Sequence, residues 1–271
     1  MGAVTTDEEL AVAIAARSQL FSFRKNWAAF TVAAGQFHSS WLAAGFPGPG
    51  VAPGAAAVPT QATAGALAKF TDPSGGNFAH LVSVDANFAT SVATLELWDR
   101  LSHTSGLSGL SILSQTTNLP TAAITRGDTT GVGTEWFLEN YVATGAVPAT
   151  ATITYTNHAG VGSHTTTVAI PANWAASRLL HIGTLQAGDL WIKSIESVQL
   201  NVSTLTAGDF GVTAARPICV VCTREQGVTE IETLLDMLQR VETGACLWLT
   251  AYSSTGSIGA CRGGLQLITS G

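Results

Sequence analysis

Charged residues are scarce in this sequence. Only 11% of its 271 residues are Asp, Glu, Lys or Arg, against about 25% in a typical soluble domain. A disordered tail combines low hydrophobicity with many charges, whereas 46% of these residues are hydrophobic. Twelve Lys and Arg against 18 Asp and Glu give a net charge of −6, and no basic cluster is present to neutralise phosphates. The composition excludes a disordered tail and predicts no nucleic-acid partner.

Long uninterrupted apolar runs are also missing, although the mean hydropathy is +0.30. A membrane-spanning helix needs about 20 consecutive apolar residues. The most apolar region, Asn26–Val58, is broken by polar residues and prolines. Asp7–Glu9 make the start acidic, where a secretory signal is basic and then apolar. We therefore expect no membrane segment and no signal peptide.

The common catalytic motifs are absent as well. The sequence contains no G-x-S-x-G, Walker, H-E-x-x-H or strand-following G-x-G-x-x-G motif, so we expect no enzymatic activity and no cofactor. Glu135 and Glu139 flank Trp136, a combination that glycosidases use. On a strand, however, residues four apart are separated by about 13 Å. This spacing is too long for a retaining pair, and we expect both acids to be solvated surface residues.

Histidine and cysteine do not form a recognisable metal-binding pattern. His158 and His164 flank a predicted hairpin tip, but no carboxylate lies between Asn140 and Ser177 to complete a site. We expect no bound metal.

The four cysteines, Cys219, Cys222, Cys246 and Cys261, all lie in the last fifth of the chain, without zinc-ribbon spacing. On a strand, Cys219 and Cys222 point to opposite faces. We predict buried free thiols, with a disulfide involving Cys246 or Cys261 left open.

Helical patterns begin the chain. Thr6 and Glu9 form a capping box that predicts a helix over residues 6–21. A helical period of aromatic residues continues to Gly45, where a Pro- and Gly-rich segment begins. We interpret residues 1–60 as an N-terminal helical and Pro/Gly-rich arm.

The arm overlaps a stretch of 43 residues without charge, Asn26–Ala68. An uncharged, Trp-bearing segment of this kind indicates contact with protein along its length, because aromatics are enriched and acids depleted at interfaces. One alternative is that the aromatic stripe simply packs in the core. The candidate interface residues are Trp27, Phe30, Phe37, Trp41 and Phe46.

From about residue 78 the apolar period becomes that of strands, with turn signals at short intervals. The expected strands are His80–Val84, Val92–Asp99, Ile112–Leu119, Thr134–Val142, Ala151–Thr156, Thr165–Ile170, Ile192–Val202, Phe210–Thr213, Ile218–Thr223, Cys246–Ala251 and Gly264–Thr269. A second capping box, Thr229 with Glu232, predicts a helix over about 229–242. Residues 61–271 are thus expected to form a mainly β domain, a β-sandwich or jelly roll with one inserted helix.

Four segments carry a resemblance: Phe37–Gly50, Thr63–Leu67, Asp72–Asn77 and Leu97–His103. With them the chain, over roughly residues 35–270, resembles a group of tailed-bacteriophage virion structural proteins. The shared motifs are packing and turn patterns, and no functional residue is carried over. The resemblance implies a virion component of head or tail without enzymatic activity.

We therefore expect a capsid decoration or cement protein that bridges capsomers. Its expected partners are the major capsid protein and copies of itself, as a homotrimer. The first alternative is a phage tail protein of the tube, collar or baseplate. The second is a carbohydrate-binding or depolymerase β module that uses surface Trp residues.

Overall fold

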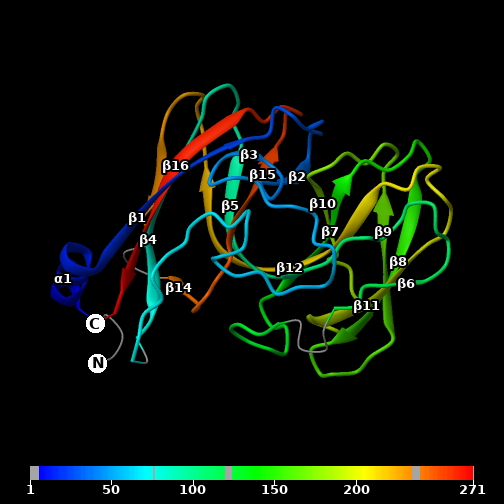
Figure 1. Cartoon of the computed structure of the whole chain (residues 1–271), viewed down its shortest axis with the longest axis horizontal. Coiled ribbons are helices and arrows are strands. Elements are labelled where there is room, and N and C mark those ends of the chain that lie inside the picture. Colours follow the sequence, from blue (N-terminus) through cyan, green and yellow to red (C-terminus); the bar gives the residue numbers. More distant parts are fainter. Residues whose placement is uncertain (1–5, 76, 120–123, 234–238, 271) are drawn as a thin grey trace.

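The computed structural model describes residues 6–75, 77–119, 124–233 and 239–270. These residues form a mainly β structure of antiparallel sheets, consistent with a β-sandwich, as the sequence predicts. Three layers lie next to one another along the long axis of the molecule (Figure 1). We call them the terminal sheet, the barrel and the outer sheet.

The terminal sheet joins strands from both ends of the chain. Its order is β13 (Glu230–Thr233), β4 (Ala79–Phe88), β16 (Ala260–Thr269), β1 (Ser18–Asn26) and β3 (Ala44–Phe46), and β14 (Gln239–Val241) also pairs with β4.

The barrel is the middle layer and is closed. Its strands follow the order β10 (Arg178–His181), β2 (Gln36–Ser39), β15 (Leu247–Ser253), β5 (Thr94–His103), β12 (Asp209–Cys222) and β7 (Glu135–Val142). The outer sheet has the order β6 (Gln115–Thr116), β11 (Ile192–Leu200), β8 (Ala149–Asn157) and β9 (His164–Ile170).

Two long strands of the barrel, β5 and β12, serve two hydrophobic cores. Leu95 and Leu97 of β5 pack in the core that the barrel shares with the terminal sheet, whereas Leu101 packs in the core shared with the outer sheet. Along β12, Val221 packs in the core shared with the terminal sheet and Phe210 in the core shared with the outer sheet. Side chains on the opposite face of these strands point into the barrel, because strand residues alternate between two faces.

The predicted first helix is confirmed as α1, Asp7–Arg17, and it ends four residues before the expected Phe21. The Thr6 hydroxyl accepts a hydrogen bond from the Glu9 amide over 3.2 Å, as the capping box requires. Ala13 is buried against the terminal sheet. Within the described part of the chain, no helix is both long and apolar enough to cross a membrane.

The predicted helical course between Trp27 and Trp41 is wrong. These residues form turns around the short strand β2. The Trp27 indole donates to the Ser39 carbonyl (3.0 Å) and the Trp41 indole to the Val51 carbonyl (2.8 Å). Long-range packing of both indoles therefore overrides the local helical period.

The helix expected over 229–242 is also wrong where the structure describes it. Glu230–Thr233 and Gln239–Val241 are strands β13 and β14, both antiparallel to β4; residues 234–238 lie outside the described residues. Ile231, expected on a buried helical face, is 63% exposed. The backbone hydrogen bonds offered by β4 determine the conformation here.

The strand predictions after residue 78 are confirmed in position, with changes in extent. Phe210–Thr213 and Ile218–Thr223 are two parts of the continuous strand β12. Ile112–Leu119 contains only the two-residue strand β6. Sequence reasoning missed β1, β2 and β3, which lie inside the segment interpreted as an arm and pair with strands from elsewhere in the chain.

Candidate functional site

The five predicted interface residues do not form one surface. Trp27 is fully buried, with Phe30 packed beside it, in the core between terminal sheet and barrel. Trp41 is buried in the barrel, where Phe37 packs against the same cluster. Phe46 differs from the other four, because it is 64% exposed on the edge strand β3. Only Phe46 therefore presents a largely exposed side chain to a neighbouring subunit.

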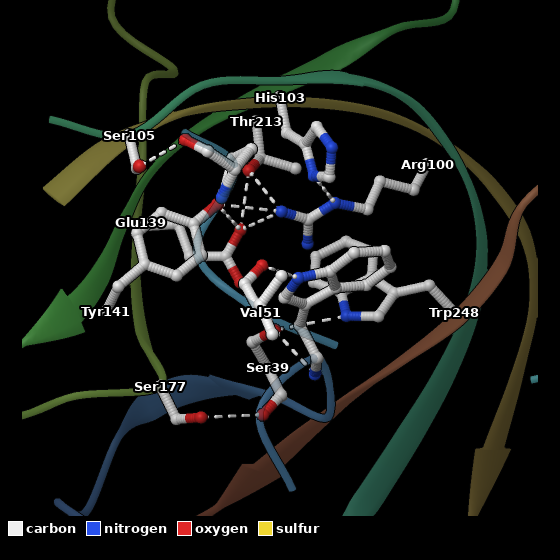
Figure 2. A network of polar contacts seen from close by, with 12 residues as sticks. Ser39, Val51, Arg100, His103, Ser105, Glu139, Tyr141, Ser177, Thr213 and Trp248 are labelled. Carbon is white, nitrogen blue, oxygen red and sulfur yellow. Dashed lines mark hydrogen bonds and ion pairs between the residues drawn. The ribbon is translucent and has the colours of Figure 1, made fainter. Parts of the chain in front are cut away.

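A buried charge lies inside the barrel at Arg100 (Figure 2). Its Nη2 donates to Glu139 Oε2 over 2.6 Å and to Tyr141 Oη over 2.9 Å. The Thr213 hydroxyl donates to the same carboxylate oxygen over 2.5 Å. Arg100 Nε donates to His103 Nδ1 over 3.0 Å. Strands β5, β7 and β12 thus meet at one ion pair.

The flat side of the guanidinium is covered by two indoles. Arg100 Cζ lies 4.2 Å from the ring centroid of Trp41 and 5.0 Å from that of Trp248. A cation over a desolvated indole contributes roughly 2 kcal/mol. Trp248 is held in turn by its hydrogen bond to the Ser39 hydroxyl, 3.1 Å away (Figure 2). The candidate interface residue Trp41 therefore packs against Arg100 of its own chain.

Electrostatics fixes the protonation states in this cluster. Burial is the largest influence on Arg100 and disfavours its charge, but the Glu139 carboxylate, Tyr141 and Cys246 together outweigh burial and raise the pKa of Arg100. Burial, together with the charge of Arg100, lowers the pKa of His103 to about 2. His103 is therefore neutral, and its Nδ1 accepts the hydrogen bond from Arg100 Nε. The ion pair joins strands β5, β7 and β12 inside the barrel, and Arg100 Nη1 and Glu139 Oε1 have no hydrogen-bond partner among the described residues.

The expectation of two solvated acids on β7 is wrong for Glu139, which is 1% exposed. Glu139 shares its strand face with Phe137 and Tyr141, which are also buried. Alternation with two aromatics was the sequence signal for burial. Glu135 remains partly exposed at the end of the barrel.

Glu135 and His181 form a second polar pair, at that end of the barrel. His181 Nε2 lies 2.5 Å from Glu135 Oε2, and the two side chains border a cavity of about 170 Å³. Thr134, Leu190 and Trp191 also line it. We call this cavity the barrel-end pocket. Sequence reasoning named Glu135 but missed its partners, which come from separate segments.

A third polar cluster surrounds Asp189 in the loop before β11. Its carboxylate accepts from Tyr155 and Asn157, each at 2.7 Å, and lies 2.6 Å from His164 Nδ1. Burial opposes ionisation, but these hydrogen bonds outweigh it and lower the pKa of Asp189 to about 2. The sequence around His158 and His164 contains no carboxylate, and the structure places the carboxylate of a later residue, Asp189, beside His164.

No metal centre follows from this arrangement. Across the described ranges, no group of three or more His, Cys, Asp or Glu side chains gathers where it could hold a metal ion.

The four cysteines are free, as predicted, but the prediction that they are buried is wrong for Cys222, which is exposed. Cys219 is buried and Cys222 exposed, which confirms that the two thiols diverge. Burial raises the pKa of Cys219, Cys246 and Cys261 to about 12 in each case. Thiols of this kind stay protonated and unreactive at neutral pH.

Two adjacent loops beside the outer sheet carry exposed apolar side chains. The backbones of the loops are joined by hydrogen bonds from Gly109 to Ala207 (2.6 Å) and from Thr204 to Gly109 (2.8 Å). Leu113 is 73% exposed and Leu205 70% exposed. We call the apolar surface of these loops the loop patch; its members are Leu110, Ile112, Leu113, Val202 and Leu205.

Comparisons with known proteins assign no family. No model of a known protein family matches the chain, and no curated protein matches it. A solved structure of a mutant VP2 protein of infectious bursal disease virus, in derived T=1 particles, aligns with 93% of this chain and 78% of its own. The two are 10% identical, with a TM-score of 0.16. A TM-score this low carries no argument about fold or function.

Proposed function

We propose that this protein is a non-enzymatic structural component of a phage virion, a capsid decoration or cement protein that bridges capsomers. Its partners in this proposal are the major capsid protein and copies of itself, as a homotrimer, after assembly in the host cytoplasm. The observation that carries the proposal is the loop patch. Large exposed apolar patches mark interaction sites, and these two adjacent loops carry five exposed apolar side chains.

The loop patch also lies in sequence that lacks charge. No Asp, Glu, Lys or Arg occurs between Leu101 and Ile124 or between Ser197 and Gly208. A partner that covers these loops therefore desolvates no ionised group there. Full burial of each apolar side chain contributes about 1.5–3 kcal/mol. The repeated geometry of a shell multiplies this contribution over many copies.

The contact surface proposed here differs from the one expected from the sequence. Trp27 and Trp41 are enclosed by this chain's own strands, so the loop patch and Phe46 take their place. Removal of residues 1–60 is not a suitable test, because it deletes β1, β2 and β3 from two of the layers. A jelly-roll topology for the β domain is part of this proposal.

Substitution on the loop patch tests the proposal. We expect the variant L113S/L205S to fold with an unchanged melting temperature, because both side chains are exposed, but to be lost from purified particles. The matched control is L20S/V51S, two residues that are equally exposed but lie elsewhere. Quantitative mass spectrometry of the particles measures incorporation. Wild-type incorporation of L113S/L205S would contradict the role of the loop patch.

The copy number per particle distinguishes a decoration protein from the alternative of the same class, a tail protein. Hundreds of copies per particle over the shell support decoration, whereas six copies or multiples of six along a tube support the tail. Immunogold labelling of intact particles gives the location directly.

A further inference from the structure

The barrel-end pocket is built from three separated parts of the chain. Glu135 begins β7, His181 ends β10, and Trp191 ends the loop that leads to β11. Their side chains border one cavity of about 170 Å³. This volume is small and matches one six-membered ring rather than several linked rings. None of its members takes part in the loop patch, so the pocket is independent of the proposed place in a virion.

The polar side of the pocket consists of His181 and Glu135, which contact each other. His181 contacts Glu135 over 2.5 Å and packs on Phe137 with ring centroids 5.4 Å apart. Residue 183 is glycine, and a Cβ there would lie 2.6 Å from the imidazole ring. The absence of a side chain at Gly183 therefore leaves room for the ring. The Glu135 side chain is 33% exposed, so its carboxylate is accessible to a ligand.

Thr134 supplies an independent observation. It lines the pocket and is 3% exposed, and its hydroxyl has no hydrogen-bond partner in the part of the chain that the structure describes. A buried hydroxyl without a partner costs about 1–3 kcal/mol. Buried polar groups without partners are few in native proteins, and each calls for an explanation. The hydroxyl is covered by neighbouring atoms, so a ligand that hydrogen-bonds to it must first displace them.

The apolar side of the pocket is formed by Leu185, Leu190 and Trp191. Six of the seven tryptophans are buried, and Trp191 alone is partly exposed. Leu190 beside it is 70% exposed. The pocket thus offers an indole and aliphatic carbon on one side, and hydrogen-bonding groups on the other.

We propose that the barrel-end pocket binds one hexopyranose ring of a glycan. A sugar ring has the same two-sided character, because its C–H groups pack on an indole while its hydroxyls donate to a carboxylate and exchange hydrogen bonds with a threonine hydroxyl and an imidazole. An anionic ligand is repelled by Glu135. A purely apolar ligand leaves Glu135 and Thr134 desolvated without partners, which disfavours binding.

The test uses the full chain and a panel of methyl hexopyranosides of glucose, galactose, mannose and N-acetylglucosamine. Saturation-transfer NMR detects binding, and titration gives the affinity. We expect ring-proton saturation for one or more of the four sugars. Saturation for none of them overturns the proposal, as does stronger binding of N-acetyl-lysinamide, the probe for a basic side chain.

Three variants locate the site. We expect T134V to bind about fivefold more weakly, which corresponds to one hydrogen bond, while its melting temperature stays equal to or above that of the wild type. E135Q and W191A are expected to weaken binding about tenfold or more. The matched controls E242Q and F46A change a partly exposed carboxylate and an exposed aromatic elsewhere. Wild-type affinity in T134V and W191A overturns the assignment to this pocket.

Discussion

Arg100 is a full positive charge held inside a closed barrel, and its removal leaves Glu139 as a buried charge without its ion-pair partner. We expect R100M to lower the free energy of unfolding by about 3–5 kcal/mol. R100M/E139L, which removes both charges, is expected to recover most of this loss. Urea denaturation measures the free energy of unfolding of wild type, R100M and R100M/E139L. The control R240M breaks an exposed pair and is expected to cost less than about 1 kcal/mol; an equal cost for R100M would contradict the argument.

Lys25 is a buried cation, and no carboxylate of the described residues forms an ion pair with it. Its Nζ donates to the Pro47 and Gly48 carbonyls, 2.9 and 3.2 Å away, and burial lowers its pKa from 10.5 to about 8. Between these two pH values the unfolded chain binds more protons at this site than the folded one. The Lys25 contribution therefore makes the protein more stable as pH rises through this window.

K25M removes this pH dependence. Relative to K25M, wild type is expected to gain about 2 kcal/mol of unfolding free energy between pH 7.5 and pH 10, from a pKa shift worth 1.36 kcal/mol per unit. Chemical denaturation at both pH values measures the difference. K69M alters an exposed lysine and should keep the wild-type dependence. A constant difference between wild type and K25M would show that Lys25 titrates normally.

At the scale of the element, β16 depends on a glycine at a close approach. A Cβ at Gly263 would lie 2.0 Å from the Asp85 carbonyl oxygen of β4 and 2.6 Å from the Phe23 ring of β1. We expect G263A to cost about 1–3 kcal/mol through forced shifts in the terminal sheet. G54A is the control, because a Cβ there meets nothing within 4 Å. Thermal denaturation compares the two, and equal melting temperatures would contradict the close approach.

Elements with a local signal were predictable from the sequence, and elements held by distant partners were not. Alternation revealed β8, where every second residue is buried, and β9, where Thr166, Val168 and Ile170 are buried between exposed neighbours. The Thr6 cap revealed α1. By contrast, β1 pairs with β16 across almost the whole chain, and β13 exists because β4 offers it an edge. Local propensity is a weak prior against such tertiary pairing.

The candidate site was less predictable than the fold for the same reason. The sequence marks Glu135 by its place beside Trp136, but nothing local indicates that His181 or Trp191 will join it. For the aromatic stripe the sequence left two interpretations, packing in the core and an interface, and Trp27 and Trp41 follow the first. Trp27 and Trp41 have the composition of an interface, and their partners inside this chain, Ser39, Val51 and Arg100, become visible only when the sheets are assembled.

At the scale of the whole molecule, the barrel couples the two outer layers into one folding unit. Strands β5 and β12 contribute to both cores, so loss of either core disrupts the strands that support the other. Ile153 of β8 is fully buried in the core next to the outer sheet. I153A is expected to lower the global free energy of unfolding by about 2–5 kcal/mol.

Hydrogen exchange resolves this effect by strand. If the layers unfold together, I153A lowers the protection of amides in β16, in the opposite layer, by the same free energy as those in β8. The control I231A changes an exposed residue and is expected to leave both unchanged. Wild-type protection of β16 in I153A would divide the molecule into two independently unfolding units, with β5 and β12 splitting between them. We expect one unit, because each of these strands is continuous in the barrel and neither core can keep its half of the strand without the other.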